Sequence, residues 1–192
     1  MQDYEECRKV VDETMDTYGR IDVLVNNAGV VSRRESFFKA DMEDIRRTMD
    51  INVMGTIHMI HAVSKYMADQ QKGTIVNIGS ICGTMANSES VGYHASKGAV
   101  EMVTKSLARE LSGYGIRVVC VSPGWVRTEM IDDTVAKIGA SLHMKGRIVE
   151  PEEIAGAVYL MTLDEASAVN GTTVMADDGY SAFKGIDGGQ RL

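Results

Sequence analysis

Residues 73–124 read GTIVNIGSICGTMANSESVGYHASKGAVEMVTKSLARELSGYGIRVVCVSPG, and this stretch decides the fold. It opens with a short β-branched run over 73–78, which has the length and composition of a buried parallel strand. An amphipathic helix is predicted over 93–111, and a second apolar run follows at 116–121. A strand, a helix and a strand in this order form a right-handed crossover between two parallel strands.

The same alternation continues on both sides of this unit. Further helices are predicted over 2–18, over 41–68 and from Pro151, and further strands over 21–25 and 172–176. Strands that alternate with helices predict an α/β fold, a Rossmann-like doubly wound parallel sheet with helices on both faces. No repeat or linker composition interrupts the chain, so residues 1–192 are predicted to form a single domain.

Composition narrows the classes of partner. The 20 Lys and Arg against 27 Asp and Glu give a net charge of −7, which argues against nucleic acid or an anionic membrane as a partner. Three scattered cysteines predict neither disulfides nor a zinc site, and four scattered histidines predict no metal site, so a reducing cytoplasm is the expected location. No apolar run approaches the roughly 18 residues that a membrane helix needs.

Polar residues gather where the predicted strands end. In a parallel sheet, ligands bind at the carboxyl ends of the strands. Tyr93 and Lys97 stand four residues apart on a predicted helix and therefore share one face. An ammonium beside a phenol is expected to lower the tyrosine pKa, as a general acid/base for alcohol–carbonyl interconversion requires.

Tyr93 and Lys97, and two further candidate residues, Ser80 and Asn52, also have purely structural interpretations. Tyr93 and Lys97 could be a solvated pair on a helix surface, and Ser80 could form a turn. Asn52, on the apolar stripe of the predicted helix 41–68, would need partners for its amide, either in the core or in a site. The order and spacing of the motifs favour a site.

Five motifs occur in register: Asn26-Asn-Ala-Gly29, Asn52 in Asn-Val-Met-Gly, Ser80, Tyr93-x-x-x-Lys97, and Pro123-Gly-Trp-Val-Arg-Thr128. Over essentially its whole length the chain resembles the classical short-chain dehydrogenases/reductases. The resemblance implies an oxidoreductase that uses NAD or NADP, with the choice undetermined, to interconvert a secondary alcohol and a ketone.

The resemblance also implies roles for individual residues. Tyr93 would be the general acid/base, Ser80 would hold the substrate oxygen, Lys97 would lower the Tyr93 pKa and bind the nicotinamide ribose, and Asn52 would hold a relay water. The remaining cofactor contacts would come from Asn27, Ala28, Gly29, Val126 and Thr128.

Further expectations come from the same resemblance. Residues 129–148, with Met130 and Met144, would form a lid over a small-molecule substrate, with hinges at Gly139 and Gly146. Helices 41–68 and 93–111 would form the face of a homodimer or homotetramer.

The chain departs from the family pattern in two places. Nothing in residues 1–25 resembles the Gly-rich turn that holds the pyrophosphate, so the resemblance implies an N-terminally truncated chain without the adenosine half of the site. The alternative is a non-catalytic chain that acts at most as a binding or assembly subunit, and an in-frame Gly-rich segment upstream of Met1 would distinguish the two. Asp177-Asp178-Gly179 stands where the family more often has Asp-Gly-Gly.

Overall fold

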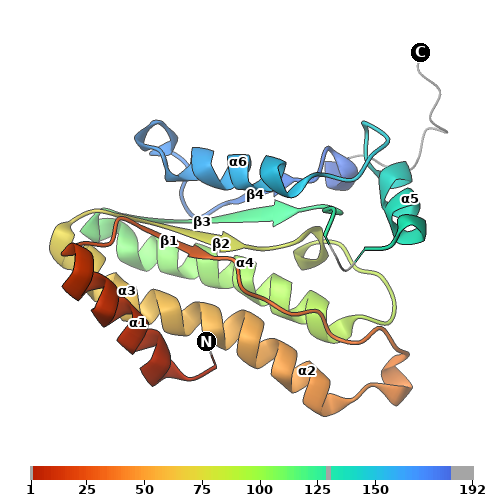
Figure 1. Ribbon diagram of the computed structural model, residues 1–192, viewed down its shortest axis with the longest axis horizontal. Coiled ribbons are helices and arrows are strands. Elements are labelled where there is room, and N and C mark those ends of the chain that lie inside the picture. Colours follow the sequence, from red (N-terminus) through yellow and green to blue (C-terminus); the bar gives the residue numbers. More distant parts are fainter. Residues whose placement is uncertain (1, 129–130, 183–192) are drawn as a thin grey trace.

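The computed structural model describes residues 2–128 and 131–182. Its centre is a sheet of four parallel strands in the order β1 (Val23–Asn26), β2 (Gly73–Ile78), β3 (Ile116–Pro123) and β4 (Thr173–Ala176) (Figure 1). Val76 of β2 lies opposite Val25 on one side and Val119 on the other. All four carboxyl ends therefore lie at one edge of the sheet, as the predicted crossovers require.

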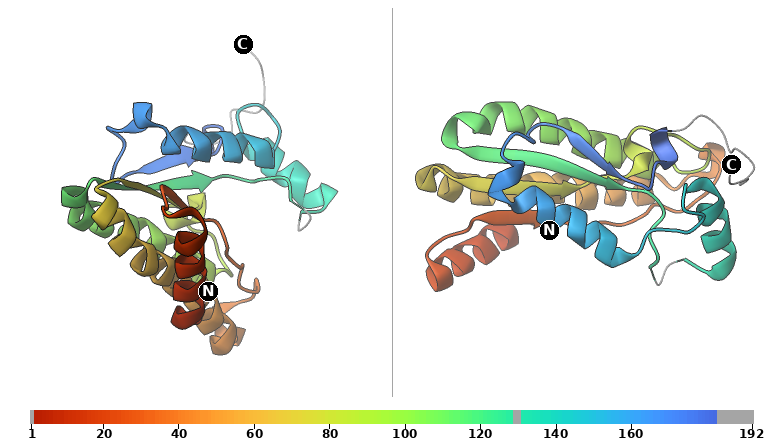
Figure 2. Two further views of the ribbon diagram at one scale, coloured as in Figure 1. Left: turned by 60° about the vertical axis from the view of Figure 1, so that its left-hand side comes forward. Right: turned by 90° about the horizontal axis from the view of Figure 1, so that it is seen from above.

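Helices cover both faces of the sheet (Figure 2). α1 (Tyr4–Tyr18), α3 (Gly55–Gln70) and α4 (Val91–Leu111) lie on one face, and α6 (Pro151–Thr162) lies on the other. Successive residues of a strand point to opposite faces. Ile75 accordingly joins the core beneath α3 and α4, whereas its neighbour Val76 joins the core beneath α6.

Local sequence signals explain where the helices begin and end. α1 begins after Asp3, whose carboxylate accepts the N–H groups of Glu5 and Glu6, and it ends at Gly19, which has a φ of 73°. α6 begins with Pro151 inside a capping box formed by Glu150 and Glu153.

The predicted single helix over 41–68 is wrong in one respect. It is two α-helices, α2 (Met42–Met49) and α3, joined by the π-helical turn Asp50–Met54. A π turn adds one residue to a helical turn, and one added residue is not visible in an apolar stripe that already mixes steps of three and four residues. The turn contains Asn52.

The remaining elements lie mostly around the carboxyl edge of the sheet. α5 (Asp133–Leu142) lies beyond the ends of the strands (Figure 1), and Val126 forms a parallel bridge with Val149. The short 3-10 turns are Phe37–Lys39, Ile81–Gly83, Ser112–Tyr114, Asp164–Ala166 and Tyr180–Ala182. In the part of the chain that the structure describes, no helix is both long and apolar enough to cross a membrane.

Candidate active site

The candidate site lies where β2 ends. Ser80 follows two residues after the strand and caps the turn Ile81–Gly83, where its Oγ accepts the N–H of Cys82 at 3.1 Å. The Ser80 side chain also forms a hydrogen bond with Tyr93, which comes from the first turns of α4. The loop between Ser80 and α4 therefore returns the chain to its starting point, as the motif spacing predicts.

Lys97 lies beside Tyr93 on the same face of α4. Its Nζ is 5.8 Å from the centroid of the Tyr93 ring and donates a hydrogen bond of 2.8 Å to the Ile78 carbonyl at the end of β2. Only 7% of Lys97 is exposed, an unusually low value for a lysine. The structure thus brings Ser80, Tyr93 and Lys97 together.

The electrostatics differ from the sequence-based prediction. Burial lowers the pKa of Lys97 to about 8. Burial also raises the pKa of Tyr93, and the hydrogen bond with Ser80 offsets only part of this effect. The prediction that Lys97 lowers the Tyr93 pKa is wrong for this arrangement, because the ammonium is directed at a backbone carbonyl and desolvation of the phenol dominates.

Asn52 connects the loop after β1 to α4. Its Oδ1 accepts the N–H of Val30 at 2.8 Å, and its Nδ2 donates to the Val30 carbonyl at 2.9 Å and to Ser96 Oγ at 3.0 Å. Ser96 Oγ in turn donates to the Tyr93 carbonyl at 2.8 Å. Asn52 therefore acts as a clamp on the site in this structure, and its role in holding a relay water stays a prediction.

The loop Asn27-Ala28-Gly29 lies exposed at the end of β1. A Cβ atom on Gly29 would lie 3.1 Å from Asn52 Oδ1 and 3.7 Å from Lys97 Nζ. A side chain at this position would therefore crowd Asn52 and Lys97, whereas glycine leaves the backbone open to close approach. The buried ammonium and the phenol beside it are donors of the kind that ribose hydroxyls accept, so these residues are compatible with the ribose end of a dinucleotide.

Val126 and Thr128 follow the end of β3. Val126 is held by its bridge to Val149, and Thr128 is exposed. Their contacts with a cofactor stay predictions, as do those of Asn27 and Ala28.

The predicted lid contains a helix, α5, and Gly139, one of its two proposed hinges, lies inside that helix. A Cβ atom there would lie 2.9 Å from both Trp125 Cγ and Ile148 Cγ2, so Gly139 permits close packing inside α5. Gly146 has a φ of 66° and forms a turn. Met130 lies outside the described residues.

Sequence reasoning missed several buried polar residues around the site. Asn26 Nδ2 donates to Asn77 Oδ1 at 2.9 Å, and Asn77 Nδ2 donates to Thr104 Oγ1 at 2.9 Å, so amides link β1, β2 and α4. Glu101, one turn after Lys97, is buried, and burial raises its pKa. The sequence signal that could have identified these residues is a polar side chain inside an otherwise apolar run.

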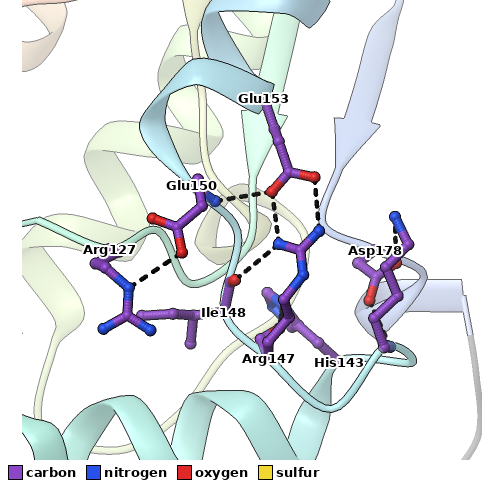
Figure 3. Close-up of polar contacts among 8 residues, drawn as sticks. Arg127, His143, Arg147, Ile148, Glu150, Glu153 and Asp178 are labelled. Atoms are coloured by element: carbon purple, nitrogen blue, oxygen red, sulfur yellow. Dashed lines mark hydrogen bonds and ion pairs between the residues drawn. The ribbon is translucent and has the colours of Figure 1, made fainter.

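The segment between β3 and α6 is held by charged groups (Figure 3). The Arg147 guanidinium pairs with both oxygens of Glu153, at 2.6 and 2.9 Å, and this ion pair lowers the pKa of Glu153 to about 2. Arg127 donates to Glu150 at 3.1 Å. These contacts attach the segments around Arg127 and Arg147 to the start of α6.

Comparison with known proteins extends these observations. A family model described as enoyl-(acyl carrier protein) reductase matches residues 1–181. The 3-oxoacyl-[acyl-carrier-protein] reductase of Synechocystis sp. is 36% identical over 180 residues, which cover 93% of this chain and 72% of that protein. The 3alpha-hydroxysteroid dehydrogenase of Mediterraneibacter gnavus is 36% identical over 180 residues, with 92% and 72% covered.

Solved structures show the same arrangement of elements. The structure described as ElxO with NADP bound has a TM-score of 0.90 and 27% identity, and the match covers 95% of this chain and 76% of that one. A gluconate 5-dehydrogenase from Burkholderia cenocepacia, in complex with NADP and tartrate, has a TM-score of 0.89 and 29% identity, with 95% and 73% covered.

Proposed function

Because the chain belongs to the classical short-chain dehydrogenase/reductase family, we propose that it is an NAD(P)-dependent oxidoreductase that interconverts a secondary alcohol and a ketone. The observation that carries this proposal is the convergence of Ser80, Tyr93 and Lys97 at the carboxyl edge of the sheet. A phenol, a hydroxyl and a buried ammonium at one point are the groups that proton exchange with a substrate oxygen requires.

Tyr93 exchanges the proton in this proposal. Its raised pKa keeps the phenol protonated at neutral pH, so the phenol donates a proton to the oxygen of a ketone as that oxygen gains charge. Ser80, hydrogen-bonded to the phenol, holds the same oxygen and stabilises the charge that develops on it. Lys97 and Gly29 are proposed to contact the nicotinamide ribose.

The dinucleotide, when bound, supplies or accepts the hydride. Val126, Thr128, Asn27 and Ala28 are proposed as its remaining contacts. Two solved structures with NADP bound support a nicotinamide coenzyme, and NAD and NADP are both candidate coenzymes of this chain. The substrate is proposed to be a small ketone or alcohol, since the relatives are named for acyl, steroid and sugar-acid substrates.

A homodimer or homotetramer through α2, α3 and α4 remains part of the proposal. Met102 on α4 is 61% exposed and Met54 in the π turn is 42% exposed, so apolar surface is present on these helices. Sedimentation of the purified chain tests this. The cytoplasmic location expected from cysteine usage stays a prediction.

Substitution of Tyr93 tests the proposal. Tyr93→Phe keeps the ring and removes the proton, so turnover of a 3-oxoacyl or ketosteroid probe with NADPH or NADH should fall by about 10²–10⁴-fold, the loss typical for a general acid. Coenzyme affinity, measured by calorimetry, should stay within about twofold. Undiminished turnover in Tyr93→Phe would exclude Tyr93 as the acid.

The same calorimetry addresses the alternative of a non-catalytic chain. Binding of neither coenzyme, with no turnover at high coenzyme concentration, would favour a binding or assembly subunit.

A further inference from the structure

His143 is a buried histidine that the proposed reaction does not use. It follows the last residue of α5 and is only 4% exposed, although histidine is more often partly solvated. In Figure 3 it lies beneath Arg147, within the segment that joins α5 to α6. Its two ring nitrogens have different backbone partners.

The contacts of the ring determine which of its nitrogens carries the proton in the neutral form. Trp125 N–H donates to His143 Nε2 at 3.2 Å, so this nitrogen presents its lone pair. Nδ1 lies 3.1 Å from the Arg147 carbonyl, which accepts only, so Nδ1 carries the proton. A second proton on Nε2 would oppose the Trp125 N–H with another N–H, and this hydrogen bond would be lost.

The residue that His143 holds belongs to the motif loop after β3. Trp125 O accepts the N–H of Val149, and Arg127 N–H donates to Val149 O, each at 2.8 Å. With the contact to His143, three hydrogen bonds fix the backbone that carries Val126. The Trp125 N–H, which His143 accepts, comes directly after Gly124 at the end of β3.

The surroundings leave the imidazole little freedom. A Cβ atom on Gly124 would lie 2.6 Å from His143 Nε2 and 3.0 Å from Asp177 Cβ, so only glycine fits between the strand end and the ring. The Tyr180 ring packs against the imidazole with centroids 5.9 Å apart.

Charged groups nearby are bound to other partners. The Asp177 carboxylate accepts the N–H groups of Gly179 and Ser181, and Asp178 accepts the N–H of Lys145 and pairs with its ammonium. Arg147 pairs with Glu153. In the described residues, neither aspartate is hydrogen-bonded to the ring to stabilise a second proton.

We propose that His143 is a positioning residue: in its neutral, Nδ1–H form it fixes the backbone of the loop Pro123–Thr128 and so holds the coenzyme side of the site. The coenzyme part of this inference rests on the proposed function. A second ring proton, on Nε2, would break the contact with the Trp125 N–H, so acid should release the loop.

The only tryptophan of the chain permits a test without coenzyme, because Trp125 is itself the clamped residue. In the 192-residue chain, Trp125 fluorescence should change on acidification with a one-proton midpoint. His143→Gln, whose amide oxygen can accept the Trp125 N–H but cannot titrate, should lack this transition. His61→Gln, the same change on α3 at the contact with Tyr4, should keep it. Nitrogen NMR should show His143 protonated at Nδ1 and bare at Nε2 at slightly alkaline pH.

Coenzyme titration completes the test. His143→Leu should weaken NADPH or NADH binding by about fivefold to tenfold, the equivalent of one lost hydrogen bond, and His143→Gln should restore binding to within about threefold of the unsubstituted chain. An unchanged acid transition in His143→Gln, or a proton on Nε2, would overturn the clamp. Equal binding by the Leu and Gln variants would overturn its effect on the coenzyme side. A chain that binds neither coenzyme but keeps the His143-dependent transition would refute the proposed function and leave the clamp in place.

Discussion

Replacing Lys97 by methionine should stabilise the fold while removing a residue of the proposed site. Lys97 is 7% exposed and its ammonium has one hydrogen-bond partner identified in the described residues, the Ile78 carbonyl. Its charge is therefore poorly solvated, and its pKa falls from 10.5 to about 8. Methionine has a similar length and needs no solvation.

The size of the effect follows from that pKa. A difference of one in pKa corresponds to about 1.4 kcal/mol, so the charged ammonium destabilises the native state by about 3 kcal/mol below pH 8. Loss of the hydrogen bond to Ile78 removes about 1 kcal/mol of stabilisation. Lys97→Met should therefore raise the free energy of unfolding by about 2 kcal/mol at pH 7.

The pH dependence has a definite sign. Between pH 8 and 10.5 the unfolded chain still binds the Lys97 proton and the native chain has released it, so the native state gains stability as the pH rises. Methionine has no such proton. The stability advantage of Lys97→Met should be largest below pH 8 and should shrink steadily as the pH rises toward 10.5.

Urea unfolding at several pH values between about 6.5 and 9.5 measures this difference. Lys105→Met is the matched control, since it makes the same change at an exposed lysine on the same helix and should alter stability by less than about 0.5 kcal/mol. If Lys97→Met is no more stable than the unsubstituted chain at pH 7, or if its advantage does not change with pH, the buried-charge argument is refuted.

Three further changes test other parts of the structure. Asn52→Ala removes three hydrogen bonds to Val30 and Ser96, so the free energy of unfolding in urea should fall by about 2–4 kcal/mol. Asn87→Ala is the control at an exposed asparagine, and an equal loss in that variant would contradict the clamp. Gly139→Ala places a Cβ atom 2.9 Å from Trp125 Cγ, so it should lower the free energy of unfolding by about 1–3 kcal/mol and change the tryptophan emission. Unchanged emission and stability would show that α5 can move aside. Within the described residues β1 pairs with β2 alone, and Val25 of β1 is 41% exposed. An unpaired strand edge favours self-association, so light scattering should detect oligomers of the chain, and Val25→Lys should suppress them. A monodisperse unsubstituted chain would refute this prediction.

Those features of the molecule that depend on near neighbours were predictable from the sequence. The alternation of strands and helices gave a parallel α/β sheet, because hydrophobic periodicity and capping residues act within one element. Tyr93 and Lys97 share a face because helical geometry alone places residues four apart side by side. The order of the motifs placed Ser80 beside them, since parallel strands end at one edge.

The tertiary structure alone decided what those residues experience. The raised pKa of Tyr93, the π turn around Asn52 and the clamp of His143 on Trp125 all depend on groups brought together from distant parts of the chain. Burial sets the solvation of a phenol or an ammonium, and burial comes from packing, which no short stretch of sequence contains. The sequence therefore determined which residues meet at the site, and the packed fold determined which protonation states and hydrogen bonds they adopt there.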